Sequence, residues 1–212
     1  MTKLIIFDFY GTLVENGVYS PVKQVKFILD IPDEFKDYIG KFETVFMTKE
    51  HESLKQGFIA VAEAFGIDPE EQKIDACIGM WNKNTLLARP FRDAIFALTK
   101  LKEDYKIALL ANTDNFSVPQ IIKKYELEQY FDYMLFSSKE GMLKTNPEAI
   151  GKILAALDVK SEDAVLVGDS IDSDMRAAEN AGIRGILLDR RNRRDYPDKI
   201  RNLHEIGPKL MQ

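Results

Sequence analysis

The chain has 212 residues, of which 45% are apolar and 30% are charged. This length and balance are typical of a globular protein with one large domain, or with a core and a small insertion. The net charge of −5 does not indicate a nucleic-acid partner, because surfaces that bind nucleic acid are strongly basic. No run approaches the ~18 apolar residues of a membrane span, so we expect no membrane partner.

The chain has a single cysteine, Cys77, which excludes an intrachain disulfide. This fits a reducing compartment, and we expect a cytoplasmic protein that is a monomer or a homodimer. Cys77 lies in an apolar stretch and is predicted to be a core residue, because a reactive thiol needs an electropositive, accessible setting. The arginine-rich run 190–194 is interpreted as a solvated loop, with contact to an anionic substrate or partner subunit as the alternative.

The first predicted element is a strand over residues 3–9. This continuous apolar run is rich in β-branched and aromatic side chains, as in a buried strand of a parallel sheet. Gly11 and Thr12 follow at once and end it.

Residues 20–84 are predicted to be helical. Ser20 and Pro21 indicate a helix start, with the serine as N-cap and the proline at the first helical position. Further helical patterns cover 35–46, 53–65 and 69–81, and no strand is predicted among them. The stretch therefore resembles an insertion of about four helices.

From residue 91 onward, helices and strands alternate. Helices are predicted over 91–101, 118–130, 147–157 and 172–181, and strands over 106–111, 134–137, 164–167 and 185–188. Repeated βα units predict an α/β fold with a parallel sheet covered by helices on both faces. We expect the core to comprise residues 1–14 and 88–212, and the helical insertion to comprise residues 15–87.

Chemically active side chains follow the predicted strands. Asp8 ends the first strand, residues 111–114 end the second, Lys144 follows the third, and Asp169 ends the fourth, with Asp172 and Asp174 close behind. Because ligand sites of parallel sheets lie beyond the carboxyl ends of the strands, we expect these groups to converge.

Two converging carboxylates, Asp8 and Asp169, would repel each other unless a cation lay between them. Mg²⁺ prefers oxygen ligands, and a site with Mg²⁺, a lysine and backbone N–H groups suits a phosphoryl group. Asp8 could then attack phosphorus and form an acyl phosphate.

Each residue also has a structural interpretation. An aspartate after a strand is often a turn former, and a lone lysine such as Lys144 is usually a surface charge. Asp172 could be the N-cap of its helix and Asp174 a first-turn acid favoured by the helix dipole. The combination supports the functional interpretation, because unrelated turns would not place all these groups at consecutive strand ends.

Four motifs resemble those of the haloacid dehalogenase-like (HAD) hydrolase superfamily. The segment 7–14 is similar to its first motif, 110–113 to its second, Lys144 with Pro147 to its third, and 168–174 followed by 177–178 and 181–182 to its fourth. The resemblance implies a Rossmann-like parallel-sheet core and explains the helical insertion as a cap domain placed after the first strand.

The resemblance also implies roles for individual residues. Asp8 is expected to be the nucleophile and a Mg²⁺ ligand, with the backbone carbonyl of Tyr10 and the carboxylate of Asp169 as further ligands. Lys144 is expected to neutralise the nucleophile and the phosphate. The remaining roles are support of the metal site by Asp174 and Ser170 and orientation of substrate oxygens by Asn112 and Thr113.

Two positions depart from the family pattern. Phosphatases of this family usually have a second aspartate two residues after the nucleophile, which protonates the leaving group and activates water, whereas this chain has Tyr10. A phenol with a pKa of about 10 can donate a proton but is a poor base near neutrality. The second motif usually has Ser or Thr where this chain has Ala111.

The favoured function is a Mg²⁺-dependent phosphatase that acts on a small phosphorylated metabolite through a phospho-Asp8 intermediate. Tyrosine at position 10 also resembles the 2-haloacid dehalogenases, in which Asp attacks carbon without a metal. That branch uses an arginine of the cap and lacks the second metal-binding aspartate, whereas this chain has no arginine before Arg89 and retains Asp169.

The third hypothesis is a protein of the same fold that binds metal or phosphate with little turnover. Replacing Tyr10 with aspartate is expected to raise turnover if the protein is a phosphatase.

Overall fold

A computed structural model describes residues 2–210, so positions 1, 211 and 212 of the predicted core lie outside the described range. Its centre is a six-stranded sheet in the order β5-β4-β1-β6-β7-β8, and every neighbouring pair is parallel. The strands are β1 (Leu4–Phe7), β4 (Lys106–Ala111), β5 (Tyr133–Phe136), β6 (Ala164–Gly168), β7 (Arg184–Leu188) and β8 (Lys199–Ile200). The predicted α/β class and parallel sheet are confirmed.

The sheet is covered on both faces because its strands carry apolar side chains on both sides. Ile5 and Phe7 of β1 pack into one cluster with side chains of α5 (Arg92–Leu101) and α6 (Ser117–Lys124). Leu4 and Ile6 point to the opposite face and pack with α8 (Pro147–Leu157) and α9 (Arg176–Asn180). Successive side chains of a strand point to opposite faces of the sheet, and in β1 both sets are apolar. A strand that is buried on both faces belongs in the middle of the sheet.

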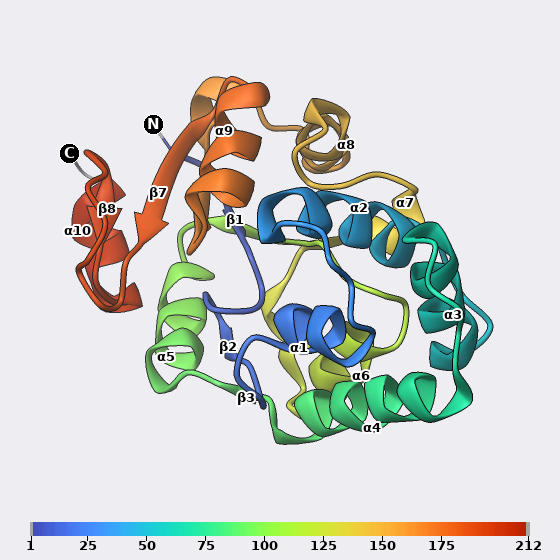
Figure 1. Cartoon of the computed structure of the whole chain (residues 1–212). Coiled ribbons are helices and arrows are strands. Elements are labelled where there is room, and N and C mark those ends of the chain that lie inside the picture. The colour runs from blue at the N-terminus through green and yellow to red at the C-terminus, as the bar shows by residue number, and fades with distance from the viewer. Residues whose placement is uncertain (1, 211–212) are drawn as a thin grey trace.

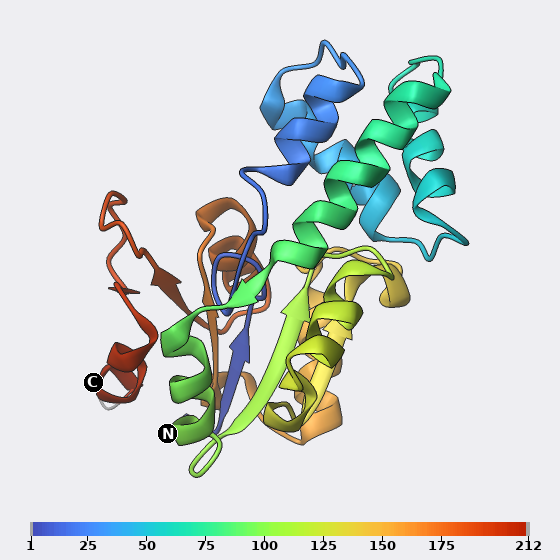
Figure 2. The same cartoon turned by 90° about the horizontal axis from the view of Figure 1, so that it is seen from below.

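Four helices form a group of their own beyond the sheet edge (Figures 1 and 2). They are α1 (Pro21–Ile28), α2 (Phe35–Met47), α3 (Leu54–Ala64) and α4 (Glu71–Leu87). They surround a separate core of buried aromatic and aliphatic side chains that includes Tyr38, Phe42, Phe46 and Phe58. Cys77 is fully buried in this core, as predicted, and burial raises the pKa of its thiol to about 12.

A short antiparallel pair joins the helical group to the sheet, and sequence analysis missed it. It consists of β2 (Val14–Glu15) and β3 (Arg89–Pro90). Figure 2 shows the arrowheads of β1 and β4 pointing toward the helices, so the helical group lies over the carboxyl ends of the strands.

The predicted helix over 118–130 is wrong in its second half. Helix α6 ends at Lys124, and Glu126 adopts a left-handed backbone with φ 54°. A 3₁₀ turn (Leu127–Tyr130) then leads into β5. The left-handed residue reverses the chain direction, which an α-helix cannot do while it continues.

The predicted helix over 172–181 begins instead with one π-helical turn (Ile171–Met175) and becomes α9 only afterwards. The N–H groups of Asp174 and Met175 both donate to the Ser170 carbonyl, at 3.0 and 3.1 Å. Asp174 also accepts a hydrogen bond from the Ser170 N–H at 2.9 Å. This widened turn brings the Asp174 carboxylate back toward the end of β6, and π-turns of this kind occur often at functional sites.

Ser20 is not an N-cap in the expected sense. Its backbone is left-handed, with φ 44°, and its side chain makes no capping hydrogen bond. Its carbonyl still accepts the Gln24 N–H at 3.1 Å, and Pro21 occupies the first helical position as predicted.

Several short elements were not predicted because each is too short, at two to five residues, for a hydrophobic pattern to repeat clearly. The predicted strand end at Ser137 is the start of α7 (Ser137–Glu140). The others are β8 and the turns and helix at Ser161–Asp163, Leu203–Glu205 and α10 (Ile206–Leu210). Within residues 2–210, no helix combines the length and apolarity needed to cross a membrane.

Candidate active site

The predicted catalytic side chains meet at the carboxyl end of β1. The ammonium of Lys144 donates to Asp8 Oδ1 at 2.5 Å and to Asp174 Oδ1 at 2.7 Å. All three side chains are buried. Burial lowers the pKa of Lys144, but Asp174 and Asp8 outweigh it and leave that pKa well above its usual value, so the lysine is a fixed positive charge.

Asp8 lies directly after β1 and has both oxygens engaged. Thr12 donates its hydroxyl to Asp8 Oδ2 at 3.0 Å, opposite the Lys144 contact on Oδ1. Burial and the neighbouring Asp174 raise the pKa of Asp8 to about 7. A nucleophilic carboxylate therefore depends on positive charge nearby, which Lys144 supplies in part.

Asp169, at the end of β6, completes an acidic group with Asp8 and Asp174. One carboxylate oxygen from each of the three lies within 4.8 Å of the other two. Burial and Asp174 raise the pKa of Asp169 to about 6. The backbone passes so close to two of these carboxylates that glycine is required at two positions. A Cβ on Gly11 would lie 2.4 Å from Asp169 Oδ2, and one on Gly168 would lie 2.2 Å from Asp174 Cγ.

These residues fit a Mg²⁺ ion. The donors are hard carboxylate oxygens, and their mutual repulsion, which raises two of the pKa values, is what a divalent cation would offset. Asp174 has its oxygens bound by Lys144 and the Ser170 N–H, which suits the supporting role predicted for Asp174 and Ser170. Asp8 and Asp169 are then the side chains that would hold the ion, and the Tyr10 carbonyl as a third ligand stays a prediction.

Asn112 and Thr113 follow β4 and reach the same cavity. The backbone N–H of Lys144 donates to Asn112 Oδ1 at 2.8 Å. The Asn112 amide nitrogen therefore points away from the loop that carries Lys144. Thr113 is buried, and its hydroxyl donates to the Asp114 carbonyl at 3.0 Å. Asn112 is thus the better placed of the two to donate to a substrate oxygen.

Tyr10 is among the residues that line the cavity, but its hydroxyl is buried from solvent with no hydrogen-bond partner among the described residues. Burial, and to a smaller extent Asp114, raise the pKa of Tyr10. The ring packs edge-on against Phe9 with centroids 5.1 Å apart.

The cavity above Asp8 has a volume of about 290 Å³, and α1, α2 and α4 contribute to its lining. The lining residues from α2 are Phe35, Ile39, Glu43 and Met47. Met47 also packs in the helical core, whereas Phe42 and Phe46 are fully buried there and do not line the cavity.

Sequence analysis missed Glu43. It lies one turn after Ile39 and one turn before Met47, so an acid interrupts an apolar helical face. That interruption was the available signal. In the structure Glu43 is half-buried, and Asn112 Nδ2 donates to Glu43 Oε2 at 3.4 Å.

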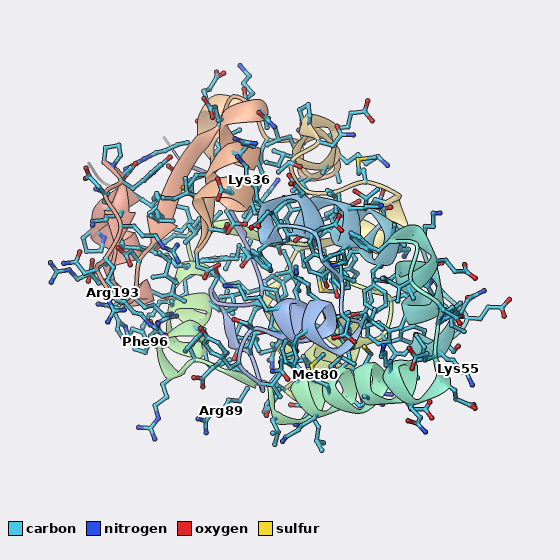
Figure 3. All side chains as sticks on the ribbon, viewed as in Figure 1. Lys36, Lys55, Met80, Arg89, Phe96 and Arg193 are labelled. Atoms are coloured by element: carbon cyan, nitrogen blue, oxygen red, sulfur yellow. The ribbon has the colours of Figure 1, made fainter. Side chains whose placement is uncertain are left out.

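The arginine run divides into two parts. Arg190 donates to Asp93 from both terminal nitrogens, at 2.8 and 3.1 Å, and to the Thr12 carbonyl at 2.9 Å. The other three arginines are exposed, in keeping with a solvated loop, and Figure 3 shows Arg193 at the left periphery of the molecule, on the side opposite Lys55. They line a second cavity of about 330 Å³ that shares Asp169 with the first.

Comparison with known proteins adds independent information. The family model described as haloacid dehalogenase-like hydrolase matches residues 5–188 of this chain. A glyceraldehyde 3-phosphate phosphatase of Methanopyrus kandleri is 30% identical over 198 residues, which cover 88% of this chain and 79% of that protein. Another, from Pyrococcus furiosus, is 32% identical over 85 residues, so this chain spans only 35% of its length.

The fold is also similar to that of solved structures. A 2-haloacid dehalogenase from Pseudomonas syringae pv. Tomato superposes with a TM-score of 0.69 at 19% identity, covering 100% of this chain and 99% of that one. At this identity the likeness concerns the fold alone. The side chains of the site must therefore distinguish phosphate ester hydrolysis from dehalogenation.

Proposed function

Because this chain belongs to the haloacid dehalogenase-like hydrolase family, we propose that it is a Mg²⁺-dependent phosphatase that acts through a phospho-Asp8 intermediate. It is a hydrolase that acts on phosphate esters, in keeping with its phosphatase-named relatives. The Lys144 ammonium held between Asp8 and Asp174, with Asp169 beside them, is the observation that carries the proposal.

The substrate class follows from the cavity. Its volume of about 290 Å³ is at the small end of ligand pockets, which suits a small phosphorylated metabolite with its phosphate at Asp8. Glyceraldehyde 3-phosphate, named for the relatives, is the first ester to test.

The chain's own residues perform the first step. Thr12 and Lys144 hold the Asp8 carboxylate in place, and one Asp8 oxygen attacks phosphorus as the ester oxygen leaves. Lys144 and the Asn112 amide then face the phosphoryl oxygens and stabilise their negative charge. A Mg²⁺ ion held by Asp8 and Asp169 would supply further positive charge for the phosphoryl group.

The helical group, residues 15–87 in the predicted division, is proposed to act as a cap. Side chains of α1, α2 and α4 line the cavity over Asp8, so substrate has to pass between the helices and the sheet edge. Closure would exclude water during the attack by Asp8, and opening would release product.

A panel of phosphate esters tests the proposal. We expect release of inorganic phosphate from at least one ester with Mg²⁺ and little release in EDTA. The Asp8→Asn variant should lose at least ~10³-fold in kcat, because removing a nucleophile removes the pathway. If a folded wild-type protein released phosphate from no ester, or if Asp8→Asn retained its activity, the proposal would be wrong.

One observation favours a second candidate, because Tyr10 resembles the tyrosine of 2-haloacid dehalogenases. The cavity argues against it, since no arginine is among its described lining residues and Glu43 would repel the carboxylate of a haloacid. Chloride release from 2-chloropropionate in EDTA would establish this candidate over the phosphatase.

A further inference from the structure

The proposed reaction needs a proton donor and acceptor that Tyr10 does not supply. The leaving alcohol must gain a proton, and the water that later attacks the phospho-aspartate must lose one. The Tyr10 hydroxyl is buried from solvent without a hydrogen-bond partner in the described chain, and burial raises its pKa. Such a phenol is a poor proton acceptor near neutrality.

Glu43 is the carboxylate that faces the phosphate position from the opposite wall of the cavity. It projects from α2, one turn from both Ile39 and Met47, and all three side chains line the cavity over Asp8. Its Oε2 lies 3.4 Å from Asn112 Nδ2, the amide nitrogen expected to contact a phosphoryl oxygen. A bound phosphate would therefore lie between Asp8 below and Glu43 above.

The described part of the chain offers the Glu43 side chain no structural partner that would explain its position. Among residues 2–210 its carboxylate forms no ion pair, and the one hydrogen bond of its side chain is the long contact with Asn112. Asn112 does not depend on Glu43 for its orientation, because the Lys144 N–H already holds Asn112 Oδ1 at 2.8 Å. A structural anchor would be paired more closely.

The surroundings favour a carboxyl group that exchanges a proton. Burial raises the pKa of Glu43, Lys144 and the Asn112 contact lower it, Asp174 raises it, and the net shift is upward. Lys144 and Asp174 are the charged groups that shift this pKa, and the other charged residues of the cavity lining are Asp8, Lys23, Asp114 and Asp169. A glutamate with a raised pKa is suited to act as acid in one step and base in the next.

We propose that Glu43, reaching in from α2, is the general acid and base that replaces the aspartate absent at position 10. The inference rests on the proposed phosphatase function and deepens it. In the first step Asp8 bonds to phosphorus, the bond from phosphorus to the ester oxygen breaks, and Glu43 gives its proton to that oxygen. In the second, water bonds to phosphorus, Glu43 takes the proton from the water, and the electron pair of the phospho-aspartate bond returns to Asp8.

The Glu43→Gln variant tests this assignment, because glutamine keeps the shape and the contact with Asn112 but cannot exchange a proton. Turnover of an alkyl phosphate with Mg²⁺ should fall by roughly 10²- to 10⁴-fold. With p-nitrophenyl phosphate, whose leaving group needs no proton, rapid mixing should show a burst of one p-nitrophenolate per enzyme followed by slow turnover. The burst arises because the first step survives while hydrolysis of phospho-Asp8 lacks its base.

Glu63→Gln is the matched control. Glu63 is an exposed glutamate on α3, and this variant should keep wild-type rates with both substrates. A second variant, Glu43→Ala, distinguishes loss of proton transfer from loss of structure. Added formate can enter the space left by the missing side chain and carry the proton in its place. Formate should speed Glu43→Ala by at least ~10-fold and leave Glu43→Gln unchanged.

The assignment is overturned if Glu43→Gln keeps alkyl phosphate turnover within about threefold of wild type, or if its loss lies in KM with no burst and no rescue of Glu43→Ala. Those results would make Glu43 a substrate-binding or structural residue. Wild-type protein run in parallel separates the two proposals. If wild type releases no phosphate, the phosphatase function fails, whereas an active wild type with an equally active Glu43→Gln removes only the role of Glu43.

Discussion

At the scale of single residues, the site depends on a balance of buried charges. Lys144 is the only cation that contacts Asp8 and Asp174 in the described structure, at 2.5 and 2.7 Å. Two carboxylates and one ammonium leave a net negative charge, and Asp169 adds to it. Removing Lys144 would leave the buried carboxylates with uncompensated repulsion, so this ammonium is what allows them to lie close together.

Tyr10→Phe should stabilise the protein. The hydroxyl is buried with no partner among residues 2–210, so removing it relieves a desolvation cost while the ring keeps its edge contact with Phe9. We expect the free energy of unfolding to rise by about 1 kcal/mol, measured by urea denaturation. A loss of stability would mean that the hydroxyl has a partner in solution, such as a bound water.

Tyr10→Asp should restore activity to the Glu43→Gln variant. Sequence alone predicted a gain in the wild-type chain, but Glu43 already offers a carboxylate at the cavity, so the gain belongs in the variant that lacks one. We expect phosphate release at least ~10-fold faster than in Glu43→Gln alone. Tyr10→Asn in the same background is the control, and equal rates for the two would show that the added carboxylate does not transfer protons.

At the scale of elements, helix α4 is joined to the core by one buried network. Trp81 Nε1 donates to Asp114 Oδ2 at 3.0 Å and to Ser117 Oγ at 2.9 Å. Asp114 also accepts the N–H groups of Phe116 and Ser117 at the start of α6. The network therefore joins the helical group to the sheet layer near the cavity.

Trp81→Phe should loosen this joint. It removes the donor to a buried carboxylate and leaves a cavity, which together should cost about 2–4 kcal/mol of unfolding free energy. Circular dichroism is the appropriate measurement because Trp81 is the chain's only tryptophan. Leu87→Ala, at an exposed position of α4, should cost far less, and equal losses would contradict the assignment.

The loop after β7 is held to α5 by Arg190 and Asp93, and this contact should make stability depend on pH. Burial raises the pKa of Asp93, but hydrogen bonds from Arg190 and the Leu203 N–H lower it by more. The pKa of Asp93 in the folded protein is therefore below its usual value. Folding therefore favours the charged form. The contribution is complete above the unfolded pKa of about 4 and is lost as the pH falls through the folded pKa.

Asp93→Asn measures that contribution. At pH 7 we expect a loss of about 1–3 kcal/mol in unfolding free energy, because the guanidinium loses a charged partner. The difference from wild type should shrink as the pH falls below about 4. Asp104→Asn, at an exposed aspartate, is the control. A difference that stayed constant down to low pH would show that packing rather than charge is responsible.

At the scale of elements, the errors of prediction share a cause. The break after α6 and the π-turn before α9 depend on the left-handed Glu126 and on the return of Asp174 to the Ser170 N–H. The first is the backbone conformation of a single residue, and the second is a hydrogen bond between residues four apart in one turn. Hydrophobic periodicity correctly indicated the helices and strands around them, but it does not report the backbone conformation of one residue or a local polar hydrogen bond.

At the scale of the whole molecule, the active site belongs to two layers that each have their own core. The acidic group lies at the end of the sheet, and the wall opposite it comes from α1, α2 and α4. Figure 2 shows both layers, with the helical group above the strand ends. Binding of an ion at Asp8 and Asp169 would act on the sheet layer and stabilise the folded chain by mass action.

Mg²⁺ should raise the thermal midpoint of unfolding. At a hundredfold excess over Kd the gain is ~2.7 kcal/mol, which for a chain of this size corresponds to roughly 5–10 °C. Differential scanning calorimetry with Asp169→Asn should show little of this shift, and Asp172→Asn, at an exposed neighbour, should show all of it. A shift that survives in Asp169→Asn would place the ion elsewhere.

Sequence by itself determined the sheet and the side chains at its edge. Asp8 and Asp169 directly follow strands, and parallel strands in one sheet bring their carboxyl ends together. Lys144 comes later, after α7, so the loop that carries it completes its placement. Only the tertiary structure decided what faces them. Glu43 belongs to a helix that packs around a separate core, and its approach to Asn112 depends on how the two layers meet, which no local pattern encodes. The burial of the Tyr10 hydroxyl is likewise set by neighbours distant in the chain.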